Sequence, residues 1–175
     1  MKPRNVIRNV IEASPAALPA TPPANVRQAP VLDPRQMDVL TACLVGEAGG
    51  EGPRGMQAVM NVIVNRSGND YLKFSAVALR PKQFSMFNKA TGIKPTKTVA
   101  QVIDQYRNHP LWAQAQLYVR DAVAGTLPDV TVNAKFYHAQ RVSPKWANSK
   151  NRTAQVGNHI FYRESLADRL LRQLL

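Results

Sequence analysis

Apolar positions recur at helical spacing near the start of the sequence. The first stripe consists of Met37, Leu40, Leu44 and Glu47. Asp33-Pro34 precedes it as an N-cap and a first helical residue, and Gly49-Gly50 follows it as a stop signal. The pattern therefore predicts a helix whose last turn carries the Glu47 carboxylate on its apolar side.

A second helix is predicted after Pro53. Its apolar stripe consists of Met56, Val59, Met60 and Ile63, and a separate polar stripe consists of Gln57, Asn61 and Asn65. Residues 70–96 have an irregular pattern with short turns, and two more helices are predicted over 98–107 and 110–124. Helices therefore account for most of the predicted structure.

The pattern changes to alternation in the C-terminal part of the chain. Residues 132–139 and 155–163 are rich in β-branched and aromatic residues, and the segment between them is polar, basic and turn-rich. This arrangement predicts two antiparallel strands joined by a long loop. Residues 164–175 follow as a short amphipathic helix. The expected fold class is α+β, mostly helical with a small antiparallel sheet.

Composition divides the chain into two parts. Residues 1–30 are rich in proline and alanine and predict a flexible basic segment, so the folded domain is expected over 31–175. The 23 Lys and Arg against 11 Asp and Glu give a net charge of +12, which favours a polyanionic partner. The one cysteine, Cys43, excludes an internal disulfide. The sequence shows neither a signal-peptide core nor an apolar run long enough to span a membrane.

Glu47 is the strongest candidate for chemistry. A carboxylate on the apolar side of a helix is partly desolvated, which favours its protonated form and suits a general acid. The alternative is a helix-end ion pair with Arg54 or Arg66. Glu51 is the candidate second carboxylate, with a helix N-terminal charge as its alternative role. One acid suffices where a hydroxyl of the substrate, rather than water, attacks the anomeric carbon.

Histidines and aromatic residues supply further candidates. His138 and His159 lie on the two predicted strands and, with Glu47 or Asp129, would suggest zinc, although no closely spaced ligand pair supports it. Trp146 lies in the basic loop between the strands. An exposed ring among polar side chains suits sugar stacking, and equally single-stranded nucleic acid.

Three ordered motifs resemble the spore-cortex-lytic (SleB-type) family of cell wall hydrolases. They are GEAGGEGPRGMQAVMNVIVNR at 46–66, PKQFSMF at 81–87 and the long segment at 133–163. The resemblance implies a lysozyme-like lytic transglycosylase fold and cleavage of the MurNAc-GlcNAc strand of peptidoglycan. It implies Glu47 as the catalytic acid and base, and no cofactor or metal. Together with the loop aromatic, the motif positions give the substrate-binding candidates Gln83, Phe84, Tyr137, His138, Trp146 and His159. Asn61 and Asn65 also match, as members of a buried polar network, while Lys135 departs from the family pattern.

Two differences from a spore enzyme suggest that the chain acts in another biological setting. Without a signal peptide or a peptidoglycan-binding repeat, the chain looks like a bacteriophage endolysin or a virion-associated lysin. Such a protein would pass from the host cytoplasm to the periplasm and wall, or be carried in the virion. We expect a monomer whose partners are peptidoglycan and the anionic envelope, with no specific nucleic acid. The alternatives are a zinc-dependent peptidoglycan amidase or peptidase, and a non-enzymatic basic virion or nucleic-acid-binding protein.

Overall fold

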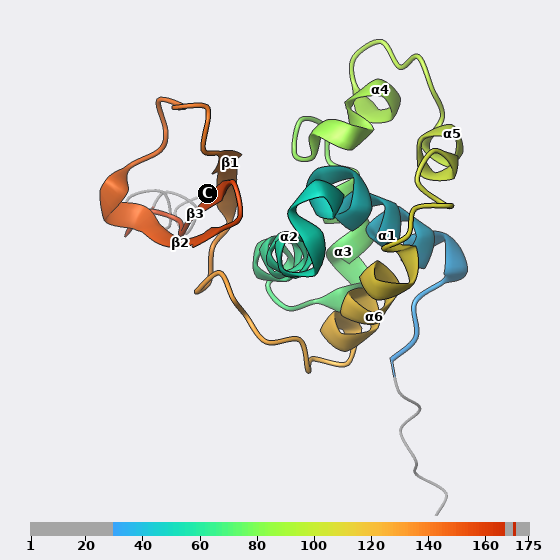
Figure 1. The fold of residues 1–175 in the computed structure, drawn as a ribbon, viewed down its shortest axis with the longest axis horizontal. Coiled ribbons are helices and arrows are strands. Elements are labelled where there is room, and N and C mark those ends of the chain that lie inside the picture. The colour runs from blue at the N-terminus through green and yellow to red at the C-terminus, as the bar shows by residue number, and fades with distance from the viewer. Residues whose placement is uncertain (1–29, 167–169, 171–175) are drawn as a thin grey trace, which may run out of the picture.

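The computed structural model describes residues 30–166 and 170. Its helices are α1 (Pro34–Ala48), α2 (Gly52–Ser67), α3 (Phe74–Ala78), α4 (Asn88–Thr91), α5 (Val99–Asp104) and α6 (Trp112–Val123), and its strands are β1 (Phe136–Ala139), β2 (Arg152–Val156) and β3 (His159–Tyr162). Figure 1 shows the sheet beside α2, at one side of the helical body. The predicted α+β class is confirmed. Residues 1–29 of the segment expected over 1–30, and most of the expected helix over 164–175, lie outside the described residues.

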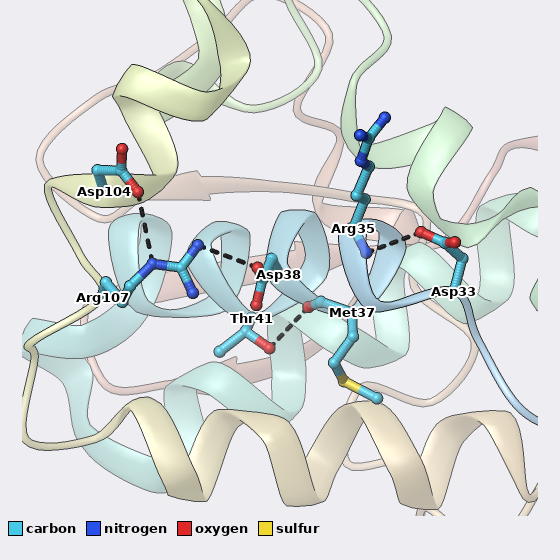
Figure 2. Close-up of polar contacts among 7 residues, drawn as sticks. All are labelled: Asp33, Arg35, Met37, Asp38, Thr41, Asp104 and Arg107. Carbon is cyan, nitrogen blue, oxygen red and sulfur yellow. Dashed lines mark hydrogen bonds and ion pairs between the residues drawn. The ribbon is translucent and has the colours of Figure 1, made fainter.

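Helix α1 begins as its sequence predicts. The Asp33 side chain accepts a hydrogen bond from the backbone N–H of Arg35 at 2.8 Å (Figure 2). The backbone N–H of Asp33 donates in return to the Gln36 side chain at 3.3 Å, which completes a capping box. Arg107 then connects α1 to the end of α5, because its guanidinium contacts Asp38 at 3.0 Å and Asp104 at 3.4 Å (Figure 2). These contacts hold the connection between α5 and α6 against α1.

Helices α1, α2 and α6 enclose the main core. Its largest fully buried side chains include Leu40, Leu44, Met56, Met60, Ile63, Phe74, Phe84 and Phe87. The apolar stripes predicted for the first two helices supply much of this set, because one face of each helix turns inward. Cys43 is fully buried, and burial raises the pKa of its thiol, which agrees with an inert core residue.

The polar stripe of α2 holds the segment that leads into the sheet. Asn61, which is 2% exposed, donates to the carbonyl of Pro128 at 3.2 Å and accepts from the N–H of Val130 at 3.0 Å. Asn65 donates to the carbonyl of Ala134 at 3.1 Å. Side-chain amides thus satisfy backbone groups that a sheet would otherwise pair. The predicted polar network is present, with Asn61 buried and Asn65 only partly buried. We refer to residues 128–135 as the strap.

The sheet has three strands rather than the predicted two. The strand order is β1-β3-β2, and both pairs are antiparallel. The segment predicted as one strand over 155–163 is a β-hairpin that turns at Gly157-Asn158, and its first strand extends back into the predicted loop. Gly157 has φ of 54°, a left-handed conformation that glycine adopts without strain.

The remaining helical predictions need smaller corrections. Residues 70–96, predicted as irregular, contain the short helices α3 and α4 together with 3₁₀ turns at Tyr71–Lys73 and Ser85–Phe87. Both later helices are present but shorter than predicted, as α5 and α6. Within the described part of the chain, no helix is long and apolar enough to cross a bilayer.

Candidate active site

Three donors from two distant parts of the chain hold the carboxylate of Glu47. Its Oε1 accepts from the Ser85 hydroxyl at 2.9 Å and from the backbone N–H of Met86 at 2.8 Å. Its Oε2 accepts from the hydroxyl of Tyr137, 90 residues away, at 2.8 Å. The side chain remains partly exposed. The carboxylate therefore has a fixed orientation and is still accessible to solvent.

Gly46 permits the close approach of the Met86 side chain to the last turns of α1. A Cβ added at residue 46 would lie 3.0 Å from Met86 Cβ and Cε, and 3.1 Å from Cζ of Tyr106. These distances are shorter than ordinary van der Waals contacts, so a larger residue would push the loop away. The Met86 N–H, one of the three donors to Glu47, consequently depends on Gly46, the residue before Glu47.

Tyr137 reaches Glu47 from β1, on the face of the sheet that turns toward α2. Its ring stacks on Phe161 with centroids 5.6 Å apart and meets the edge of His159 at 5.1 Å. Burial and the neighbouring Glu47 raise the pKa of Tyr137 well above its ordinary value, so the phenol keeps its proton. A phenol hydroxyl both donates and accepts, so the contact accommodates Glu47 as a carboxylate or as a carboxylic acid.

A partly buried arginine, Arg66, lies near this tyrosine. Arg66 donates from Nε to the carbonyl of Lys135 at 2.6 Å, and its guanidinium lies 5.3 Å from the Phe84 ring centroid and 5.8 Å from that of Phe136. Burial lowers the pKa of Arg66, and Tyr137 opposes that shift, but a guanidinium remains charged. Arg66 thus connects α2, the strap and the start of β1.

The alternative role for Glu47, a helix-end ion pair, is not observed. The partners of Glu47 in the described residues are Ser85, Met86 and Tyr137, and neither Arg54 nor Arg66 forms an ion pair with it there. The carboxylate is therefore oriented by neutral donors. This leaves its charge available for a ligand.

Glu51 is engaged elsewhere. Its carboxylate accepts from the backbone N–H of Asn158 at 2.8 Å and from the Asn158 side-chain amide at 3.2 Å. These bonds, with the backbone bond as the largest effect, lower the pKa of Glu51, against a smaller opposing effect of burial. A Cβ at Gly157 would collide with the same carboxylate. Glu51, directly before α2, therefore fastens the connection between α1 and α2 to the β2–β3 turn.

A pocket of about 590 Å³ opens beside Glu47. Its lining comprises Glu47, Gly50, Glu51, Ala139, Gln140, Arg141, Asn158 and His159. One wall belongs to the end of α1 and the other to the turns of the sheet. Both candidate carboxylates thus face one pocket. The Glu51 carboxylate is hydrogen-bonded to Asn158 in the β2–β3 turn, whereas the Glu47 carboxylate has no hydrogen bond to that turn.

His159 contributes a neutral imidazole to this pocket. Burial lowers its pKa, although Glu51 and Glu47 oppose the shift. Its Nδ1 is buried and has no hydrogen-bond partner among the described residues. At neutral pH the ring is therefore an uncharged group between the two carboxylates.

Two predicted site residues lie on the other face of the sheet. Successive strand residues point to opposite faces, so His138 turns away from the face that carries Tyr137. The His138 ring stacks on Tyr162 at 5.3 Å and meets Trp146 edge-on at 5.6 Å. The structure therefore does not bring His138 and Trp146 together with Glu47.

This separation removes the basis for a zinc site. His138 and His159 face opposite sides of the sheet, and both nitrogens of His138 have partners, Ala139 O at 2.9 Å and Tyr162 Oη at 3.0 Å. Asp129 accepts instead from Thr131 within the strap. Across residues 30–166 and 170, no three histidine, cysteine or acidic side chains are placed to hold a metal.

The Gln-Phe-Ser segment contributes differently from the prediction. Phe84 is 1% exposed and belongs to the core, so its ring offers no face to a ligand. Gln83 is partly exposed. The residues of this segment that contact Glu47 are Ser85 and Met86, which sequence reasoning did not select. Both residues nevertheless lie within the PKQFSMF motif at 81–87.

Comparisons with known proteins show the family and the fold of the chain. The family model described as Cell Wall Hydrolase matches residues 50–162, which begins just after Glu47. The catalytic domain of the germination-specific lytic transglycosylase SleB from Bacillus anthracis is similar in structure, with a TM-score of 0.54, 24% identity, and coverage of 75% of this chain and 97% of that one. The catalytic domain of the Bacillus cereus SleB protein gives the same TM-score and identity, covering 76% and 93%. At this identity the likeness shows a shared fold. No curated protein matches significantly.

Proposed function

Since the chain belongs to the cell wall hydrolase family, we propose that it cleaves the glycan strand of peptidoglycan as a lytic transglycosylase with Glu47 as its single acid and base. The observation that carries the proposal is the Glu47 carboxylate, held by three neutral donors at the wall of an open pocket. The shared fold with a protein described as a lytic transglycosylase supports it.

The reaction needs one group that first gives a proton and then takes one. Protonated Glu47 donates to the oxygen that links MurNAc C1 to the next sugar, and the C1–O bond breaks. The 6-hydroxyl oxygen of the same MurNAc then bonds to C1, and its proton returns to the Glu47 carboxylate. The product is a 1,6-anhydro end, no water is consumed, and the acid is regenerated.

The contacts around Glu47 suit both steps. The Met86 N–H and the Ser85 hydroxyl support the ionised form on Oε1. The Tyr137 hydroxyl can donate to an ionised Oε2 or accept from a protonated one. The bonds that commit Glu51 to Asn158 make it a poor second carboxylate, which favours attack by the sugar hydroxyl over attack by an activated water.

His159 and Gln83 are the proposed substrate-binding side chains on the Glu47 side. His159 lines the pocket, and its neutral ring can exchange hydrogen bonds with sugar hydroxyl or acetamido groups. The finer biological proposal is an endolysin or virion-associated lysin acting as a monomer. Its net charge of +12 suits an anionic envelope.

Mass spectrometry of fragments released from purified peptidoglycan tests the proposal. A lytic transglycosylase leaves 1,6-anhydro-muramoyl ends, whereas a hydrolase leaves reducing ends that carry the mass of one water. Anhydro ends are the expected result. Reducing ends would assign a hydrolase, and intact glycan with cut stem peptides would overturn glycan cleavage altogether.

A further inference from the structure

The outer face of the sheet, which turns away from Glu47, carries a cluster of aromatic rings. Its members are Phe136 and His138 of β1, Tyr162 of β3 and Trp146 of the loop over 140–151. The Trp146 ring centroid lies 5.8 Å from Phe136, 5.6 Å from His138 and 5.5 Å from Tyr162. The three strand residues hold the indole in a fixed place.

Packing on the strand residues covers only about half of the Trp146 side chain. Trp146 is 50% exposed, and Val142 in the same loop is 46% exposed. A ring whose sole role is to attach the loop would be stabilised most by full burial. An indole with one side packed on rings and the other in water instead offers a rigid apolar surface to a ligand.

The loop that carries Trp146 is strongly basic. Lys145 and Lys150 are exposed in it, and no acidic residue occurs between positions 140 and 153. Arg141, at the start of the loop, is also exposed but lines the Glu47 pocket. Among the described residues, neither lysine side chain forms an ion pair. Aromatic surface and uncompensated positive charge therefore occur together on one loop.

We infer that the Trp146 loop and the outer aromatic cluster form a second binding surface for peptidoglycan, which takes a strand other than the one being cut. The pyranose rings would stack on Trp146, and Lys145 and Lys150 would face carboxylates of the stem peptides. The choice of occupant rests on the proposed function. The surface lies on the opposite face of the sheet from the pocket, so a strand bound there leaves the pocket open for a second strand.

Co-sedimentation with insoluble peptidoglycan tests this surface. The experiment uses Glu47→Gln as the parent protein, so that the wall is not degraded during the measurement. Trp146→Ala and the double variant Lys145→Gln/Lys150→Gln should each weaken binding about tenfold. The double variant Lys89→Gln/Lys94→Gln makes the same charge change on exposed lysines of the helical body and should bind as the parent does.

A fluorescence measurement reports on Trp146 directly. The chain has two tryptophans, so adding Trp112→Phe to the parent leaves Trp146 as its one indole. Solubilised glycan strands should shift its emission to shorter wavelength and protect it from iodide. The Trp146 loop is then in contact with sugar.

Several outcomes would overturn the inference. If Trp146→Ala and Lys145→Gln/Lys150→Gln both bind peptidoglycan as the parent does, the inference is wrong. A lower melting temperature of Trp146→Ala would then mean that the Trp146 ring only stabilises the loop. Unchanged Trp146 emission in the bound protein would also contradict it. If the test variants lose binding to single-stranded DNA but keep binding to peptidoglycan, the partner of this surface is a nucleic acid. These readings do not depend on how the glycan is cut, so they remain informative if the proposed reaction is wrong.

Discussion

Tyr137 of β1 donates a hydrogen bond of 2.8 Å to Oε2 of Glu47, which joins the sheet to the last turn of α1, 90 residues earlier in the chain. Several parts of the chain position the donors to this carboxylate. The amides of α2 hold the strap, the strap leads into β1, and Gly46 admits the loop that carries the remaining two donors.

Removing the Tyr137 hydroxyl should reduce activity with little change in fold. Tyr137→Phe keeps the ring that stacks on Phe161 but leaves Oε2 of Glu47 without its donor. A hydrogen bond to a charged group contributes roughly 1.5–3 kcal/mol, so the rate of release of anhydro ends should fall about 10- to 100-fold. Tyr118→Phe, in α6, is the control. Equal rates in both variants would show that the contact does not matter for the reaction.

Gly46→Ala should damage the site more than the fold. The added methyl group pushes against Met86 and Tyr106, while alanine favours the helix by roughly 0.5–1 kcal/mol relative to glycine. We therefore expect a small change in melting temperature and a loss of activity of about tenfold or more. Full activity in a folded variant would mean that the Met86 N–H is not needed.

Glu51→Gln should alter stability in acid more than it alters activity. The pKa of Glu51 in the folded protein lies below its ordinary value of 4.5, so its stabilising effect is complete above that value and is lost as pH falls through the folded pKa. Melting temperature measured across acidic pH should fall less steeply in the variant than in the parent. Most of the activity at neutral pH should remain. An inactive but folded variant would identify Glu51 as a second catalytic carboxylate.

Asn61→Ala should destabilise the whole domain. The change removes a buried donor and a buried acceptor and leaves the backbone groups of Pro128 and Val130 without these partners. Urea denaturation should show a loss of roughly 2–3 kcal/mol in the free energy of unfolding. Gln57→Ala, which removes one exposed bond to Pro128, should cost well under half of that. Similar losses would show that the strap is not held by the buried amide.

Sequence patterns specified the helical part of this molecule well. The N-cap at Asp33 and the apolar stripe from Met37 to Glu47 located α1, because both signals are local in the sequence. The hairpin was missed although Gly157-Asn158 is a two-residue turn signal, since flanking apolar residues made the segment resemble one strand.

The site was only partly accessible to sequence reasoning. Alternation along β1 already places Tyr137 and His138 on opposite faces, so their separation could have been predicted. The pairing of Ser85 and Met86 with Glu47 could not, because it depends on how a 3₁₀ turn packs on a helix end 38 residues earlier. The Met86 N–H is a backbone group that nearly every residue type has, so the residue type at position 86 does not indicate that it donates to Glu47.

The most direct test of the role of Glu47 compares anhydro-muramoyl ends released from purified peptidoglycan by the parent protein, Glu47→Gln and Glu51→Gln. We predict abundant anhydro ends from the parent and from Glu51→Gln, and none above background from a folded Glu47→Gln protein that still binds the polymer. Continued release by Glu47→Gln would show that this one carboxylate is not both the acid and the base.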